Sequence, residues 1–160
     1  MRSNKELDSL NSVKDILALS GITATETEGQ FDKHDLDCSN DGIIEVKERW
    51  IDKTKFTQYS KEGFILEDIK YQYLLGKKSL YCNLFDYSEN KIALFWNVNK
   101  INSNITKMNC KSTTTFSNTS YTSKQIHLVN IDQCAYIFVY DNNMWTKTDK
   151  QTVINKITNW

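Results

Sequence analysis

Residues 35–47 read Asp-Leu-Asp-Cys-Ser-Asn-Asp-Gly-Ile-Ile-Glu-Val-Lys, and this stretch decides how the chain can fold. Asn and Asp directly before Gly, between two apolar runs, are typical of the turn of a β-hairpin. Because side chains alternate between the two faces of a strand, Glu45 and Lys47 would project from one face and their aliphatic neighbours from the other. The sequence therefore predicts a hairpin whose second strand carries a carboxylate next to an ammonium group.

The first arm of this hairpin would bring further carboxylates to the same place. Asp35 and Asp37 are two residues apart, so both would face one side of the strand, with His34 pointing away from them. The sequence leaves open which of the two aspartates faces Glu45. Two carboxylates and a lysine can hold a divalent cation and stabilise charge on a phosphate, which suits hydrolysis of a phosphodiester.

The remaining elements follow from hydrophobic periodicity and turn residues. Apolar spacing predicts helices at residues 5–20, 64–75 and 149–158. Alternating or apolar runs predict strands at residues 31–38, 42–50, 79–85, 91–97, 125–129 and 134–140. Three segments are weaker: 22–30 as an edge strand or loop, 52–63 as a mobile connection, and 99–123 as loop with one weak strand. This order predicts an α/β fold in which helices pack on a sheet.

Composition sets broad limits on the chain. A length of 160 residues with 39% hydrophobic residues predicts a single domain, residues 1–160. Twenty basic residues balance 20 acidic ones, which argues mildly against a protein that grips DNA with its whole surface. No apolar stretch reaches the roughly 18 residues of a membrane span, and no signal-peptide core follows the N-terminus. We expect a cytoplasmic protein without a membrane partner, and the Asn- and Lys-rich composition suggests a bacterial or phage-infected cell.

Taken together, Asp35, the turn at 39–42, the Glu45-Val46-Lys47 strand and the elements after it resemble the PD-(D/E)xK nuclease superfamily. The resemblance covers residues 31–98 and is strongest to small phage-type members. It implies a restriction-endonuclease-like α/β fold, with a mixed central sheet flanked by helices. It also implies a Mg²⁺-dependent DNA endonuclease that acts in phage DNA processing or recombination.

The resemblance assigns roles to individual residues. Asp35, Glu45 and Lys47 would be the catalytic residues, with both carboxylates on Mg²⁺ or Mn²⁺ and Lys47 beside the attacking water. The backbone carbonyl of Val46 would be a further metal ligand, and Glu6 on the first helix would supply another carboxylate. Contacts to the DNA backbone would come from Arg49, Lys53 and Lys70. A homodimer is implied as well, because cutting both strands takes two active sites.

Two other interpretations use the same residues. Residues 37–48 match the spacing of an EF-hand calcium loop, with oxygen-bearing side chains at positions one, three and five, glycine at six and glutamate at twelve. The flanking segments lack helical apolar stripes, and no second loop is present to pair with this one. The conformation of residues 43–50 discriminates, since a strand favours the nuclease and a helix favours calcium. A third interpretation is a nuclease-like fold that serves only in binding or as a structural phage component.

Overall fold

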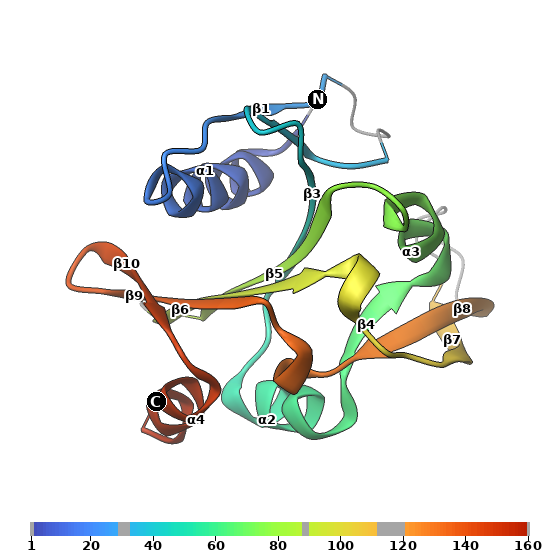
Figure 1. Cartoon of the computed structure of the whole chain (residues 1–160). Coiled ribbons are helices and arrows are strands. Elements are labelled where there is room, and N and C mark those ends of the chain that lie inside the picture. The colour runs from blue at the N-terminus through green and yellow to red at the C-terminus, as the bar shows by residue number, and fades with distance from the viewer. Residues whose placement is uncertain (1, 29–32, 88–89, 112–120, 160) are drawn as a thin grey trace.

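The computed structural model describes residues 2–28, 33–87, 90–111 and 121–159. Figure 1 shows an α/β arrangement in which helices lie on both faces of a curled, mixed sheet. The helices are α1 (Asn4–Ala18), α2 (Lys53–Glu62), α3 (Asp68–Leu74) and α4 (Lys150–Thr158), with short 3₁₀ turns η1 (Val98–Lys100) and η2 (Ile131–Gln133). None of the described helices is long and apolar enough to cross a membrane.

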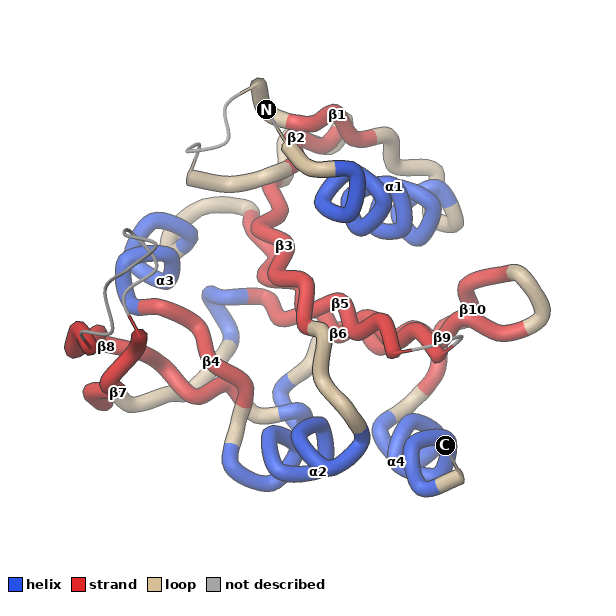
Figure 2. Tube along the Cα trace, turned by 180° about the vertical axis from the view of Figure 1, so that it is seen from behind, coloured by secondary structure: helices blue, strands red, loops and turns tan. Residues whose placement is uncertain are grey.

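The strands form two sheets. The large sheet has the order β1 (Ala24–Glu26), β2 (Leu36–Cys38), β3 (Ile43–Arg49), β5 (Ser79–Tyr87), β6 (Asn90–Asn97), β9 (Tyr136–Asp141), β10 (Met144–Thr148). The small sheet has the order β4 (Phe64–Glu67), β8 (Tyr121–Val129), β7 (Ile105–Lys111). Figure 2 shows the small sheet beside α3, away from α1.

The predicted hairpin is present and organises one end of the large sheet. β2 pairs antiparallel with β3, with Leu36 opposite Ile44. Asp41 in the turn has a positive φ of 64°, a conformation that Asp tolerates better than most residues. β3 then pairs in parallel with β5 along its whole length, from Ile43 to Arg49, after a crossover through α2, β4 and α3. Because the pairing of β2 with β3 ends at Ile44, no strand among the described residues covers the remainder of that edge of β3.

The central strands are buried on both faces, which explains their nearly continuous apolar sequences. On β6, Leu94 and Trp96 face one core while Phe95 faces the other. The first core lies against α2, α4 and the small sheet, and Phe56 of α2 is buried in it. The second lies under α1, whose buried residues are Ser9, Leu10, Val13, Ile16 and Leu17. Figure 1 shows α1 on one side of the sheet and α2 and α4 on the other.

Several expected elements are confirmed. The helices predicted at 5–20 and 149–158 are α1 and α4, and the strand pair at 79–85 and 91–97 is β5–β6. The N-terminus of α1 is closed by a capping box between Ser3 and Glu6. The segment at 22–30 contributes the edge strand β1. Residues 29–32, 88–89 and 112–120, which belong to other predicted segments, lie outside the described residues.

The prediction of a mobile connection at 52–63 was wrong, because these residues form α2. Asp52 caps the helix by accepting a hydrogen bond from the backbone N–H of Lys55 at 2.9 Å. Phe56, which is 1% exposed, is the only fully buried residue of α2, and Tyr59 packs partly against the same core, so the helix has a narrow apolar stripe. A single buried anchor stabilises it through tertiary packing, and periodicity could not reveal that.

The predicted helix at 64–75 was wrong in its first half. Phe64 and Leu66 alternate with less buried residues on β4, which pairs antiparallel with the distant strand β8. Only residues 68–74 are helical, as α3. β10 was missed, and it pairs with β9 across a turn in which Asn142 and Asn143 both have positive φ.

Candidate functional site

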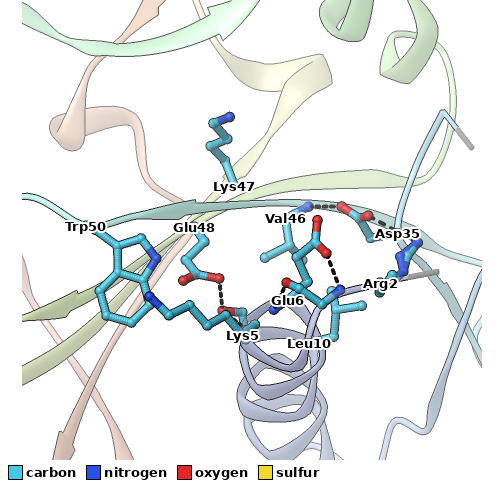
Figure 3. A pocket seen from close by; sticks show the side chains of 11 residues that line it. Arg2, Lys5, Glu6, Leu10, Asp35, Val46, Lys47, Glu48 and Trp50 are labelled. Carbon is cyan, nitrogen blue, oxygen red and sulfur yellow. Dashed lines mark hydrogen bonds and ion pairs between the residues drawn. The ribbon is translucent and has the colours of Figure 1, made fainter. Parts of the chain in front are cut away.

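Asp35 lies at the point where β2 stops covering β3. Its backbone N–H donates to the carbonyl of Ile44 at 3.0 Å. Its side-chain Oδ2 accepts from the backbone N–H of Val46 at 2.9 Å, as Figure 3 shows. The Asp35 side chain thereby replaces the missing strand neighbour, and its carboxyl group is held against β3.

Glu45 meets this carboxyl group from the next residue of β3. Its side chain is only 12% exposed, and the Asp35 carboxyl group is near enough for its charge to act on Glu45. Burial first, and the negative charge of Asp35 second, raise the pKa of Glu45 to about 7, against the opposing charge of Lys70. Oε2 of Glu45 is buried and accepts no hydrogen bond from any described residue. Two carboxyl groups thus lie close together, and a proton or a bound cation would stabilise the buried Oε2 of Glu45.

Lys47 projects from the same face of β3 as Glu45, as the alternation predicts. Figure 3 shows its side chain pointing away from α1. The side chain is exposed, and among the described residues it has no hydrogen-bond or ion-pair partner. Its ammonium group is available to an external anion.

The backbone carbonyl of Val46 lies on the edge of β3 that β2 leaves uncovered. In a strand, the N–H and the C=O of one residue point to the same side. The Val46 N–H points to Asp35, so its carbonyl does as well. Asp35, Glu45 and Val46 therefore offer oxygen atoms at one place, which suits a hard divalent cation. The described residues contain no cluster of three or more Asp, Glu, His or Cys side chains suited to hold a metal ion.

The structure favours Asp35 over Asp37 as the partner of Glu45. Oδ1 of Asp37 is 2.7 Å from Nε2 of His34, and its side chain is 62% exposed. The expectation that His34 points away from both aspartates was wrong. β2 begins only at Leu36, so strand alternation does not extend back to His34.

Lys70 belongs to the site, whereas Arg49 does not. Nζ of Lys70, on α3, is 3.0 Å from Oε1 of Glu45. Arg49 instead holds the fold together, since its Nη2 donates to the carbonyl of Ile65 at 2.7 Å and its Nε to Oδ1 of the buried Asn83. These internal hydrogen bonds leave the guanidinium poorly placed to meet a phosphate.

Glu6 and Lys53, the other two predicted residues, lie outside the cluster of Asp35, Glu45 and Lys70. Glu6 is exposed, and its Oε2 accepts from the backbone N–H of Ser3 at 2.6 Å in the α1 capping box. That hydrogen bond lowers the pKa of Glu6 and keeps the carboxylate ionised. Lys53 is the first residue of α2 and is exposed.

A surface pocket of about 410 Å³ opens between α1 and β3, on the side of Asp35. It is lined by Arg2, Ser3, Lys5, Glu6, Ser9, Leu10, Asp35, Val46, Lys47, Glu48 and Trp50. Figure 3 shows that α1 forms one wall of this pocket and β3 the other.

Three features of this pocket were not predicted from the sequence. Nη2 of Arg2 lies 3.3 Å from Oδ1 of Asp35, and no local pattern predicts that pairing. Glu48 faces α1 and accepts a hydrogen bond from the hydroxyl of Ser9, while its Oε1 is buried without a partner among the described residues. Strand alternation could have revealed Glu48, since it falls on the apolar face. Lys5 lies over the ring of Trp50.

The EF-hand interpretation does not fit this geometry. Residues 43–49 form strand β3, whereas the glutamate end of an EF-hand loop leads into a helix.

Comparisons with known proteins add no relationship to this description. No family model matches the sequence, and no match is found among curated proteins or solved structures.

Proposed function

We propose that this protein is a Mg²⁺-dependent DNA endonuclease with a restriction-endonuclease-like fold. The observation that carries the proposal is the pairing of Asp35 and Glu45 in one partly buried place. The raised pKa of Glu45 and its unpartnered Oε2 are what a metal-free cation site leaves behind. The fold-level support is the order of the elements: a helix, an antiparallel β1-β2-β3 unit, and a return to β3 by the parallel strand β5.

In this proposal, Asp35, Glu45 and the Val46 carbonyl hold Mg²⁺ or Mn²⁺. When bound, the cation supplies Lewis acidity toward a phosphoryl oxygen and lowers the pKa of water. Lys47 orients the attacking water and stabilises the charge that develops on the phosphate oxygens. Water adds to phosphorus, the P–O bond to the leaving oxygen breaks, and that oxygen takes up a proton. Two chains acting as a homodimer would cut both DNA strands.

The test is cleavage of branched, linear and single-stranded DNA with Mg²⁺, Mn²⁺ or Ca²⁺. We expect Lys47→Ala to lower the rate by about 100-fold or more, because it removes a charge aimed at the transition state. Lys147→Ala is the matched control, since Lys147 is an exposed lysine on β10, at the opposite end of the large sheet. Mn²⁺ binding should persist in Lys47→Ala and be lost in Glu45→Gln. Undiminished cleavage by Lys47→Ala would remove Lys47 from the mechanism.

A second candidate function is DNA binding without cleavage. It is favoured by the ion pairs that Arg2 and Lys70 make with Asp35 and Glu45, since these neutralise both carboxylates within the protein. This function predicts DNA binding that is indifferent to divalent cations. Stoichiometric Mn²⁺ binding to the wild-type protein, lost in Glu45→Gln, excludes it.

A further inference from the structure

Trp50 is exposed in a way that the other described tryptophans are not. It follows the last residue of β3 and is 56% exposed, whereas Trp96 and Trp145 are 0% and 7% exposed. A large aromatic ring left in water forgoes the stabilisation that burial provides, and exposed aromatic rings are common at binding surfaces. Trp50 also lines the pocket that contains Asp35.

The ring of Trp50 is held by a cation from the facing helix. Nζ of Lys5, on α1, lies 4.7 Å from the ring centroid, and Figure 3 shows the Lys5 side chain reaching to the indole. A cation over an indole is attracted by the ring and restricts its orientation. Lys5 therefore positions a ring of which more than half remains accessible.

The pocket carries charges of both signs, and the ammonium group of Lys5 lies beside this ring. Three of its side chains are acidic, and each already accepts a hydrogen bond: Glu6 from Ser3, Asp35 from Val46 and Glu48 from Ser9. The ammonium groups of Lys5, on the α1 wall, and of Lys47, which points away from α1, have no hydrogen-bond or ion-pair partner in the part of the chain that the structure describes. Arg2 offsets the charge of Asp35 at 3.3 Å, and the two unpaired ammonium groups are available to phosphate groups.

The spacing along the α1 side of β3 fits a DNA strand that runs from Val46, next to Asp35 in the candidate metal centre, to Trp50 in the same pocket. Four residue steps separate Val46 from Trp50, or roughly 13 Å in an extended chain, about the length of four stacked nucleotides. Between its ends a duplex presents only the edges of its base pairs, so an internal base can stack on an indole only when it is unpaired.

We propose that Trp50, positioned by Lys5, is a stacking subsite for an unpaired DNA base a few nucleotides from the cleavage point. The preferred substrate class is then DNA with a single-stranded segment, such as a flap, a branch or a frayed end. This inference rests on the proposed function, because it names the DNA form that the proposed nuclease takes.

The first experiment measures binding alone, in Ca²⁺ and then in EDTA, so that it does not depend on cleavage. The probe is a fluorescein-labelled oligonucleotide of about 12 thymidines, compared with the same strand carrying abasic residues at successive positions. We expect Trp50→Leu to weaken binding of the thymidine strand by about tenfold or more and Trp50→Phe by much less, since Phe keeps a stacking face. Wild-type protein should bind the abasic strand more weakly by the same factor when the missing base falls at the subsite. Trp50→Leu should not weaken binding of that abasic strand further.

The matched control is Tyr136→Leu. Tyr136 is also exposed, at 45%, but it lies on β9 and not in this pocket. Equal binding by Trp50→Leu and wild type, or the same weakening in Tyr136→Leu, would overturn the subsite.

Failure of this proposal can be distinguished from failure of the proposed function. Cleavage of flapped and plain duplex DNA at the same rates, unchanged by Trp50→Leu, would overturn the subsite and leave the nuclease. Binding of single strands that depends on Trp50, without cleavage in any cation, would support the subsite and overturn the nuclease.

Discussion

The ammonium nitrogen of Lys70 lies 3.0 Å from Oε1 of Glu45, and this contact joins helix α3 to strand β3 at the candidate metal centre. Both side chains are largely buried from solvent, with 31% and 12% of their surfaces exposed. Lys70 thereby supplies the positive charge that a cation would supply, next to the pair of carboxyl groups. The ammonium group of Lys70 and a bound divalent cation would repel each other. Formation of the Lys70–Glu45 ion pair and metal binding should therefore oppose each other.

We expect Lys70→Met to tighten divalent cation binding and to weaken DNA cleavage. Removal of a neighbouring positive charge should raise Mn²⁺ affinity by roughly tenfold, because charges about 4 Å apart near a protein surface interact by a few kcal/mol before screening. Loss of a cation near the phosphate should lower the cleavage rate. Calorimetric titration with Mn²⁺ and the cleavage assay give the two readouts.

The control for this prediction is Lys124→Met. Lys124 is also ion-paired, with Nζ 3.2 Å from Oε1 of Glu67, but the pair lies on the small sheet. Lys124→Met should change neither the Mn²⁺ affinity nor the cleavage rate. Weaker Mn²⁺ binding in Lys70→Met would contradict the coupling.

Glu45 should make the metal-free protein less stable as the pH rises. Its pKa is about 7 in the folded protein, above the usual 4.5, so between these values the folded state holds more protons than the unfolded state. The contribution of Glu45 is greatest below about pH 4.5 and is lost as the pH rises through about 7. The shift corresponds to roughly 3 kcal/mol.

Urea unfolding in EDTA measures this effect. Relative to wild type, Glu45→Gln should gain about 2–3 kcal/mol between about pH 5 and about pH 8.5, because a neutral amide avoids the cost of burying the charge. Saturating Mg²⁺ should stabilise the wild type at the higher pH and leave Glu45→Gln unchanged. A constant difference between the two proteins across this range would argue against a raised pKa for Glu45.

Arg49 should act on stability and not on DNA affinity. Its side chain joins β3 to the buried Asn83 and to the carbonyl of Ile65, and Nδ2 of Asn83 already lacks a partner among the described residues. Arg49→Lys should cost about 2–4 kcal/mol of unfolding free energy, because lysine cannot reproduce the forked geometry. At a temperature where the variant is folded, the salt dependence of DNA binding should equal that of wild type. A shallower salt slope would return Arg49 to the phosphate-contacting set.

His127 should stabilise α3 and so the position of Lys70. It is 3% exposed on β8, and its Nε2 is 2.7 Å from Oδ1 of Asp68, the first residue of α3. Its Nδ1 is 2.8 Å from the hydroxyl of Ser103. We expect His127→Ala to cost about 2–4 kcal/mol and Ser103→Ala about 1 kcal/mol, because the first empties a buried site and the second removes one hydrogen bond.

Urea unfolding ranks the two variants, and Mn²⁺ titration of the folded proteins tests the link to the site. His127→Ala should also change Mn²⁺ affinity by loosening the Lys70–Glu45 contact, whereas Ser103→Ala should not. An unchanged Mn²⁺ affinity in a destabilised His127→Ala variant would show that the stability of α3 does not affect the metal centre.

Much of the candidate site was predictable because it is built from local rules. The hairpin turn, the alternation along β3 and the capped helix α1 depend on residues close together in the sequence, and all three are present. Alternation alone put Glu45 and Lys47 on one face of β3. The choice between Asp35 and Asp37 needed coordinates, since it depends on where β2 begins and on the contact between Asp37 and His34.

Local residue patterns are enough to predict the α/β character, the hairpin and the face of the strand that carries the carboxylate and the lysine. Contacts between distant residues make residues 53–62 a helix and β4 a strand, and they bring Arg2, Lys70 and Trp50 to the hairpin. Turns, caps and alternation are stabilised by neighbours in the chain and leave a local pattern. A strand that pairs with β8 some sixty residues away, or a helix anchored by one buried Phe, is stabilised by distant partners and leaves no such pattern.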